Sequence, residues 1–320
     1  MPTFSFIIPV KPGGYVAAFE SLRRLSTATF TFEVLLAEGC SPSQQRNTAA
    51  HNAQGEILFF LDDDSHVALD CLDTCAAVMT DASVAAVGGP SLTPTNDSPL
   101  QQLFGLALSS LFGAGGMRNR YRSIGTLRDT TDKELILCNL AIRRDTFLAA
   151  GGLDERLYPN EENELLDRIQ ASGKKLKHAP HMAIRRSQRS SLRLFIRQMF
   201  SYGRGRAQQT LITGSGPIVG FIPLFFLIYL ILLPLGLLTP LFLAPLYAYI
   251  ALDIVFTVSA CVSFGSISGF LLIFLFPLMH LSNGYGLLYG LICGKNGAVP
   301  TSDNKTITIR RLKEFGQQVW

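Results

Sequence analysis

Charged residues are scarce in this sequence, and one long segment has almost none. They make up 16% of the 320 residues, against roughly 25% in average soluble domains. Between Pro217 and Gly294 there is no Lys or Arg, and Asp253 is the only acidic residue. Because about 20 apolar residues span the core of a bilayer, this deficit predicts transmembrane helices over residues 217–293. A buried helical hairpin in a soluble protein is the less favoured interpretation.

Three spans fit this segment best, at about residues 217–235, 239–262 and 268–292. An odd number of spans would place residues 294–320 outside the cell. That tail is basic, however, and the positive-inside rule favours the cytosol for it. The sequence therefore leaves open the number of passes and the side of the tail. Asp253 falls inside a predicted span, where a carboxyl group is costly unless it is paired or faces a polar cavity.

Cysteine pairs are also missing. The six cysteines show no CxxC pair and no spacing typical of a disulfide framework. Cys71 and Cys75 lie four apart on a predicted helix, without a His or a second Cys pair to complete a zinc site. This usage favours buried thiols in a reducing compartment. No signal peptide precedes the first apolar strand, so we expect the amino-terminal domain to lie in the cytosol.

Acidic residues are absent from residues 184–207, which hold seven arginines. Within this segment Leu192, Phe195, Ile196 and Met199 follow an i, i+3, i+4, i+7 pattern with arginines on the other face, which is typical of an interfacial helix. The same apolar stripe would serve equally well for packing against membrane helices. The position before the membrane segment favours attraction to anionic lipid headgroups over nucleic-acid binding. We expect residues 184–216 to form this arginine-rich helix and a linker.

The first 180 residues alternate short apolar runs with helical patterns. Strands are predicted at residues 4–10, 32–37, 56–61, 85–87, 135–140 and 176–178, and helices at 15–25, 43–53, 69–79, 144–149 and 161–172. Such alternation predicts a parallel sheet with right-handed crossovers and a nucleotide-type α/β fold. Residues 93–131 are harder to interpret, and we expect a helix and a loop over the site there.

Three consecutive carboxylates, Asp62, Asp63 and Asp64, directly follow a predicted strand. They therefore lie at the carboxyl end of the sheet, where open α/β sheets bind ligands. Asp62 and Asp64 share a side of an extended chain, and hard divalent ions take oxygen ligands of this kind. Taken alone, the triplet is as consistent with a solvated acidic turn as with a metal site.

Five sequence blocks follow one another in a characteristic order. They are Phe6–Val10, Ser43–Asn47, Gly55–Asp64, Asn139–Arg144, and Glu161–Leu165 with Arg168 and Gly173. This order resembles glycosyltransferase family 2, the inverting GT-A transferases that use nucleotide-sugar donors. The resemblance covers about residues 4–178. It implies an α/β GT-A catalytic domain, a Rossmann-like nucleotide-diphospho-sugar transferase fold, over residues 1–183, followed by transmembrane α-helices at 217–293 and the basic tail at 294–320.

The resemblance also implies a donor site and a metal site. The residues implied to bind the donor are Pro9, Val10, Glu38, Arg46, Asp62 and Asp63. Glu38 stands where the family usually has an Asp that contacts the base, and Arg46 would approach the nucleotide. Asp62 and Asp64 would hold Mg²⁺ or Mn²⁺ together with the diphosphate. His178 and His181 are interpreted as structural, although a late His completes the metal shell in some GT-A enzymes.

A general base and an acceptor region are implied as well. Glu162 occupies the position of the family's catalytic Asp, and Glu161 is the fallback base. A carboxylate suits removal of the acceptor's hydroxyl proton, although both residues could be ordinary first-turn acids favoured by the helix dipole. The residues expected near the acceptor or the membrane are Asn139, Arg197, Gln198 and Arg204.

Together these features predict a metal-dependent inverting glycosyltransferase at the cytoplasmic membrane. It would add one sugar from a UDP-linked donor to a lipid-linked acceptor, such as a polyprenyl diphosphate, in exopolysaccharide or glycolipid synthesis. The Gln-x-x-Arg-Trp motif of processive synthases is absent, which favours a single transfer. Three alternatives are a polyprenyl-phosphate glycosyltransferase that needs no base, a non-catalytic membrane scaffold that retains the fold, and a nucleotidyltransferase.

Overall fold

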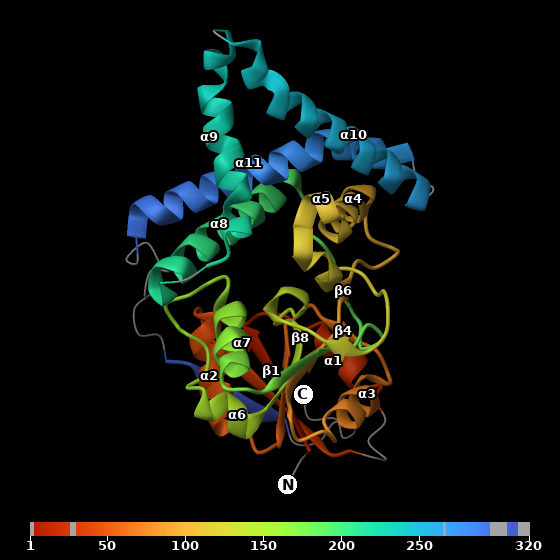
Figure 1. Ribbon diagram of the computed structural model, residues 1–320. Coiled ribbons are helices and arrows are strands. Elements are labelled where there is room, and N and C mark those ends of the chain that lie inside the picture. The colour runs from red at the N-terminus through yellow and green to blue at the C-terminus, as the bar shows by residue number, and fades with distance from the viewer. Residues whose placement is uncertain are drawn as a thin grey trace. The chain divides into compact units, whose positions relative to one another are not determined.

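The chain divides into two compact units (Figure 1). The computed structural model describes residues 3–25, 30–214, 216–237, 239–264, 267–294 and 306–312. A sheet unit comprises residues 1–92, 119–186 and 299–320, and a helical unit comprises residues 93–118 and 187–298. This division departs from the expected boundary at residue 183 in two places. Residues 93–118 pack with the carboxyl-terminal helices, and part of the tail belongs to the sheet.

The sheet unit is built on an eight-stranded mixed sheet with the order β11-β2-β1-β3-β8-β5-β9-β7. The strands are β1 (Phe4–Val10), β2 (Phe32–Glu38), β3 (Ile57–Leu61), β5 (Val84–Gly88), β7 (Arg128–Asp129), β8 (Asn139–Arg143), β9 (Lys175–His178) and β11 (Thr308–Leu312). A second sheet joins β4 (His66–Val67), β10 (Ile184–Arg185) and β6 (Ser91–Leu92).

The sequence predicts a parallel sheet, and this prediction is only partly right. β1 pairs in parallel with β2 and β3, and β5 pairs in parallel with β9. β8, however, lies antiparallel between β3 and β5, while β7 and β11 are antiparallel to β9 and β2. A strand buried on both faces is a continuous apolar run in either direction, so the pattern of β8 does not reveal its orientation.

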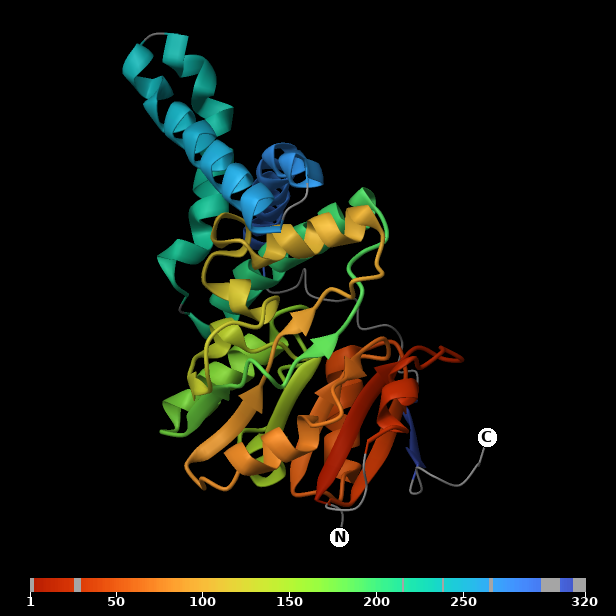
Figure 2. The same ribbon diagram turned by 90° about the vertical axis from the view of Figure 1, so that its right-hand side faces the viewer.

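Helices cover both faces of the main sheet (Figures 1 and 2). On one face, α1 (Ala18–Leu22) and α3 (Cys71–Val78) enclose a core that includes the free thiols of Cys71 and Cys75. On the other face, α2 (Pro42–Asn52), α6 (Arg144–Ala149) and α7 (Glu161–Ala171) enclose a second core around Phe60 and Phe147. Short 3₁₀ turns lie at η1 (Gly115–Arg120) and η2 (Asp132–Glu134).

The helical unit contains the predicted membrane segment. Its helices are α4 (Pro99–Ser109), α5 (Leu111–Ala114), α8 (Leu192–Thr213), α9 (Ile222–Leu232), α10 (Ala244–Phe264) and α11 (Leu272–Cys293), with 3₁₀ turns η3 (Ile218–Phe221), η4 (Leu233–Leu237), η5 (Pro240–Leu243) and η6 (Ile267–Leu271). Three helical stretches are long and apolar enough to cross a membrane, at Ile218–Gly236, Pro240–Val262 and Gly269–Cys293. They agree with the three predicted spans to within a residue or two.

Two further segments belong to the helical unit. Residues 93–118 are part of the stretch 93–131 that was expected to form a helix and a loop over the site; they include α4, which packs on α8, where the rings of Phe104 and Phe195 stack 4.1 Å apart. The arginine-rich helix expected within residues 184–216 is α8, which ends at Thr213. Gly203 lies inside this helix, where the α11 backbone approaches too closely for a Cβ.

Two polar side chains inside the apolar helices, Asp253 and His280, have hydrogen-bond partners, which lowers their cost in a bilayer. The Asp253 carboxylate is 3% exposed and accepts a hydrogen bond from Thr257 at 3.3 Å. The ring of His280 lies between the Tyr249 hydroxyl and the Phe112 carbonyl, at 2.8 Å from each. The predicted requirement for a partner at Asp253 is therefore met.

Candidate functional site

The acidic triplet lies at the end of β3, as the sequence predicts. Ser65 closes the turn, since its backbone N–H donates to the Asp62 carbonyl at 3.1 Å. The guanidinium of Arg186 contacts Asp64 at 2.7 Å and Asp62 at 3.2 Å. Burial and the two neighbouring carboxylates raise the pKa of Asp63. The oxygens of Asp62 and Asp64 thus converge on a single cationic group.

Arg46 connects this triplet to the start of α7. It projects from α2 and is 5% exposed. One of its terminal nitrogens lies 2.7 Å from Asp62, and the other lies 3.3 Å from Glu161. The structure therefore brings together three residues that the sequence analysis assigns to one site, although they come from three different elements.

Glu161 and Glu162 begin α7 but have different surroundings. Glu161 is buried, and burial, together with the neighbouring charge of Glu162, raises its pKa to about 8. Glu162 pairs with Arg120, whose terminal nitrogen lies 3.1 Å from the carboxylate. Arg120 also donates to the side chain of Asn163 and, at 2.6 Å, to the carbonyl of Asp132. Arg120 therefore fixes the position of the Glu162 carboxylate.

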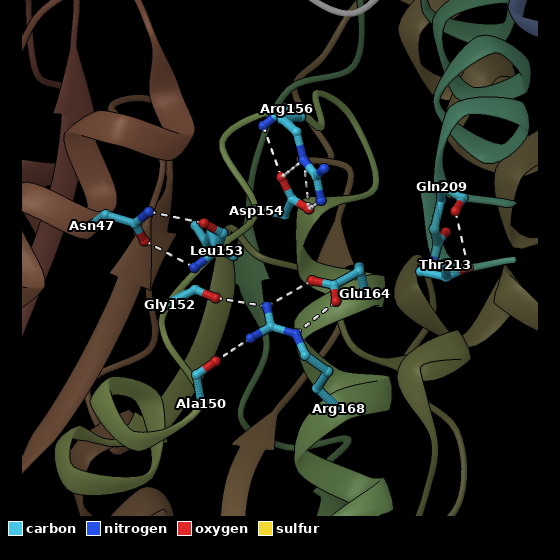
Figure 3. Close-up of polar contacts among 10 residues, drawn as sticks. All are labelled: Asn47, Ala150, Gly152, Leu153, Asp154, Arg156, Glu164, Arg168, Gln209 and Thr213. Atoms are coloured by element: carbon cyan, nitrogen blue, oxygen red, sulfur yellow. Dashed lines mark hydrogen bonds and ion pairs between the residues drawn. The ribbon is translucent and has the colours of Figure 1, made fainter. Parts of the chain in front are cut away.

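A second arginine fixes α7 against the turn that precedes it (Figure 3). Arg168 forms two bonds of 2.6 Å to the Glu164 carboxylate and donates to the carbonyls of Gly152 and Ala150. On the other side of the same turn, the side chain of Asn47 exchanges two hydrogen bonds of 2.9 Å with the backbone of Leu153. These contacts connect α2, the turn and α7, the elements that carry Arg46 and both glutamates.

The predicted base-contacting residues lie at the ends of β1 and β2. Glu38 accepts a hydrogen bond from the Gly13 backbone N–H at 3.1 Å and pairs with Arg310 of β11 at 2.8 Å. Pro9 is partly exposed, and the carbonyl of Val10 accepts from Gln45 at 2.9 Å. The carboxylate of Glu38 is therefore held from two sides, once by the turn after β1 and once by the tail.

The four residues expected near the acceptor or the membrane have separate locations. Asn139 is fully buried in the sheet unit, where it donates to the carbonyls of Met182 at 2.6 Å and Pro90 at 3.3 Å. The other three lie on α8. Arg197 is exposed, Gln198 donates to the Tyr202 hydroxyl at 2.7 Å, and Arg204 is half-buried. The contacts of Asn139 hold the segments around β6 and β10 together.

The donor set at the triplet fits a divalent cation that shares its coordination with a ligand. Asp62 and Asp64 already place oxygens around one positive group, that of Arg186. Among the described residues, no third His, Cys, Asp or Glu completes a cluster with them. Mg²⁺ is commonly held by one or two carboxylates together with substrate phosphates and water. His178 is buried, and burial lowers its pKa, so it is neutral near pH 7.

Arg120 and Arg186 belong to this cluster of charged side chains but are not among the predicted site residues. In the sequence, Arg186 is part of the arginine-rich segment, and Arg120 lies in the stretch that is hardest to interpret. Residue type and local spacing give no signal for either, because their carboxylate partners lie far away in the sequence. In the sequence, the excess of acidic residues in these motifs, Asp62, Asp64 and Glu162, indicates that basic partners are needed.

Comparisons with known proteins identify the family and the fold. A family model described as "Glycosyl transferase family group 2" matches residues 57–291. The structure of the mannosyltransferase PcManGT from Pyrobaculum calidifontis, in complex with GDP-Man and Mn²⁺, is similar with a TM-score of 0.52 and 15% identity, covering 91% of this chain and 87% of that one. No curated protein sequence matches the chain.

Structures of TarS from S. aureus are also similar, more distantly. The complex with UDP has a TM-score of 0.43 and 15% identity, and the match covers 63% of this chain and 64% of that one. The match to a longer TarS structure covers 40% of its length. The chain therefore spans less than two thirds of the TarS structures that it matches.

Proposed function

The chain belongs to glycosyl transferase family group 2 and is a glycosyltransferase of GT-A fold that uses nucleotide-sugar donors, and from this premise we propose a specific reaction. It transfers one sugar from a UDP-linked donor to the hydroxyl of a lipid-linked acceptor, in the synthesis of a cell-surface polysaccharide or glycolipid. The reaction requires Mg²⁺ or Mn²⁺ and inverts the anomeric centre. The sheet unit carries it out at the cytosolic face of the cytoplasmic membrane.

One observation carries this proposal. Arg46 contacts both Asp62, at the end of β3, and Glu161, at the start of α7, and Glu162 follows in the next position. The groups suited to a diphosphate and the group suited to a proton are thereby adjacent but distinct. Arg186, which reaches both aspartates, supplies a second positive charge beside the leaving group. This arrangement supports group transfer from a nucleoside diphosphate.

The proposed chemistry is a direct displacement. Glu162 accepts the proton of the acceptor hydroxyl as its oxygen bonds to the anomeric carbon, while the bond from that carbon to the diphosphate oxygen breaks. Arg46 and Arg186 lie where they can balance the negative charge of the departing nucleoside diphosphate. Asp62 and Asp64 would hold a divalent ion, which would supply further charge neutralisation there. Glu161 is not the base, because its pKa of about 8 keeps it protonated near neutral pH.

The three apolar helices and the exposed arginines of α8 support the proposed acceptor and location. Arg193 and Arg197 are exposed one turn apart on that helix. Both can bind the phosphates of a lipid-linked acceptor or of anionic headgroups. A lipid acceptor also explains why a transferase that adds a single sugar has a membrane segment.

The test uses membranes that contain the full chain, Mn²⁺ and a panel of radiolabelled nucleotide sugars. We expect label from one UDP-sugar to enter the organic-extractable lipid. The label should be lost with a chelator and with Asp64→Asn, but retained with Asp70→Asn, which changes an exposed carboxylate of the same segment. Incorporation that survives the chelator would overturn the metal requirement. Absence of lipid label from every donor would overturn the lipid acceptor.

A further inference from the structure

We propose that α9 and α10 alone cross the membrane, as one hairpin, and that α11 lies with α8 along the cytosolic face of the bilayer. The cytosolic side is part of the proposed function. The number of crossings rests on contacts within each unit and on the order of the chain. The occupant of the exposed apolar surface is therefore the lipid bilayer itself, with α8 and α11 at its headgroup layer.

The position of β11 determines whether the number of membrane crossings is odd or even. This strand follows α9, α10 and α11 in the chain, yet it pairs antiparallel with β2 in the sheet unit, from Thr308 opposite Glu38 to Leu312 opposite Val34. Two ion pairs reinforce the ladder, Arg310 with Glu38 at 2.8 Å and Arg311 with the buried Glu33 at 3.2 Å. The chain thus returns to the side of the membrane from which it left, and the number of crossings is even.

The Gly269–Cys293 stretch is the one that does not cross. Three stretches qualify by length and composition, and an even number leaves one of them over. In an apolar 18-residue segment of each stretch, the share buried within the protein is 6% for Ile218–Gly236 and 11% for Pro240–Val262, against 44% for Gly269–Cys293. The first two stretches present apolar side chains around most of their surface, as lipid-embedded helices do. The third is the least apolar and packs most extensively on protein.

The backbone of α11 packs closely against that of α8. A Cβ at Gly203 of α8 would overlap the Asn283 carbonyl, and a Cβ at Gly286 of α11 would overlap the Phe200 carbonyl. At Gly290 a Cβ would lie 2.8 Å from both Ala207 and the Arg204 carbonyl. Backbones in such close contact over two turns lie at the same depth in a membrane. If α11 crossed, the stretch of α8 around Arg204 would lie in the hydrocarbon, where arginine is costly.

The exposed side chains of α8 and α11 suit the headgroup layer of a membrane. On α8 the exposed Leu192 and Leu194 flank the exposed Arg193. On α11 the rings of Tyr285 and Tyr289 are exposed and lean on Phe200 of α8. Arginine beside leucine suits a layer of anionic headgroups, and tyrosine concentrates at membrane interfaces. The exposed side chains of α10 are mostly aliphatic, including Val255, Val258 and Val262, and its exposed tyrosine, Tyr247, lies near the amino-terminal end of the helix.

Cysteine labelling in intact cells tests the number of crossings. Thr239→Cys, Ser266→Cys and Thr306→Cys are made separately in the full chain, and the unmodified chain sets the background from its own thiols. An impermeant maleimide mass tag should label Thr239→Cys in intact cells, and the other two only after permeabilisation. Labelling of Thr306→Cys or Ser266→Cys in intact cells would overturn the proposal, and so would failure to label Thr239→Cys. This readout does not depend on transferase activity.

Quenching by nitroxide lipids tests the depth of α11. Tyr285→Cys, near the middle of the Gly269–Cys293 stretch, and Val255→Cys on α10 each carry a fluorophore in vesicles with anionic lipid. Headgroup nitroxides should quench the label at 285 more strongly, and acyl-chain nitroxides should quench the label at 255 more strongly. Stronger quenching of both labels by the acyl-chain nitroxide would place α11 across the bilayer and overturn the proposal.

Discussion

Glu161 and Glu162 are neighbours in the sequence, but burial raises the pKa of Glu161 to about 8, and Glu162 is the proposed base. Glu162→Gln should lower kcat about 10²–10⁴-fold with little change in the donor KM, because the side chain accepts a proton and does not bind the nucleotide. Glu161→Gln is the matched control. It should retain most of the activity, because the glutamate it replaces is already neutral. Rates with a defined donor and acceptor measure both.

The opposite result would identify a different acceptor. If Glu162→Gln keeps most of the rate, the nucleophile is a group that carries no proton, such as a lipid phosphate. If Glu161→Gln is the inactive variant, the base has been assigned to the wrong carboxylate.

The buried Glu161 also makes stability depend on pH. Its pKa is raised from 4.5 to about 8. Between these values the folded protein holds a proton that the unfolded chain has released. The free energy of unfolding therefore falls as pH rises through this window and levels off above it. Calorimetry of the solubilised protein between pH 5 and 9 should show this decline, and Glu161→Gln should flatten it. An equal slope in both proteins would contradict the assignment.

Residues whose partners are close in sequence, or that stand in a motif, could be predicted. Asp62 and Asp64 follow a readable strand, and both glutamates begin a readable helix. Arg120 and Arg186 could not be predicted, because each meets its carboxylate only after the chain has folded: Arg120 with Glu162, and Arg186 with Asp64. The sequence shows an excess of acidic residues at a site, but it does not identify the arginines that balance their charge.

At the scale of elements, α7 depends on one side chain for its attachment to the preceding turn. Arg168→Ala removes the bonds to Glu164, Gly152 and Ala150, and leaves a carboxylate that is 8% exposed without its partner. Hydrogen bonds to charged groups contribute about 1.5–3 kcal/mol each, and partial exposure of Arg168 reduces the sum. We expect about 2 kcal/mol lower stability.

Thermal unfolding measures this change, and Lys174→Ala is the control, since Lys174 is exposed near the end of the same helix. Activity should fall along with stability, because α7 carries both glutamates. A midpoint for Arg168→Ala equal to that of the control would show that the turn holds α7 without it.

The same scale shows where prediction from sequence fails. The bounds of β1 and α6 were predicted to the residue, since apolar runs and polar turns mark them. The direction of β8 and the pairing of β11 were not predicted. The pattern of apolar residues shows which face of a strand is covered. It carries no information about which strand lies alongside or in which direction that strand runs. The sequence of the tail indicates only a basic segment, because the charges of Arg310 and Arg311 obscure the alternation of side chains that is typical of a strand.

At the scale of the whole molecule, the two carboxylates proposed to hold the metal also have ion-pair partners within the protein. Arg46 and Arg186 neutralise Asp62 and Asp64 through direct contacts. A chelator should therefore abolish transfer and leave the midpoint of thermal unfolding within about 2 °C. Added Mn²⁺ should restore the rate. A large fall in the midpoint would mean that the ion holds the fold together, as structural metals do.

The pairing of β11 with β2 has a consequence for how the protein is made. β2 is synthesised early, and its edge has no partner until the chain beyond α11 has left the ribosome. An open strand edge invites pairing with other chains. During translation, the last strand to join the sheet must wait for the apolar hairpin to be delivered to the bilayer. A chain whose apolar helices miss the insertion machinery would be expected to leave this edge of β2 uncovered.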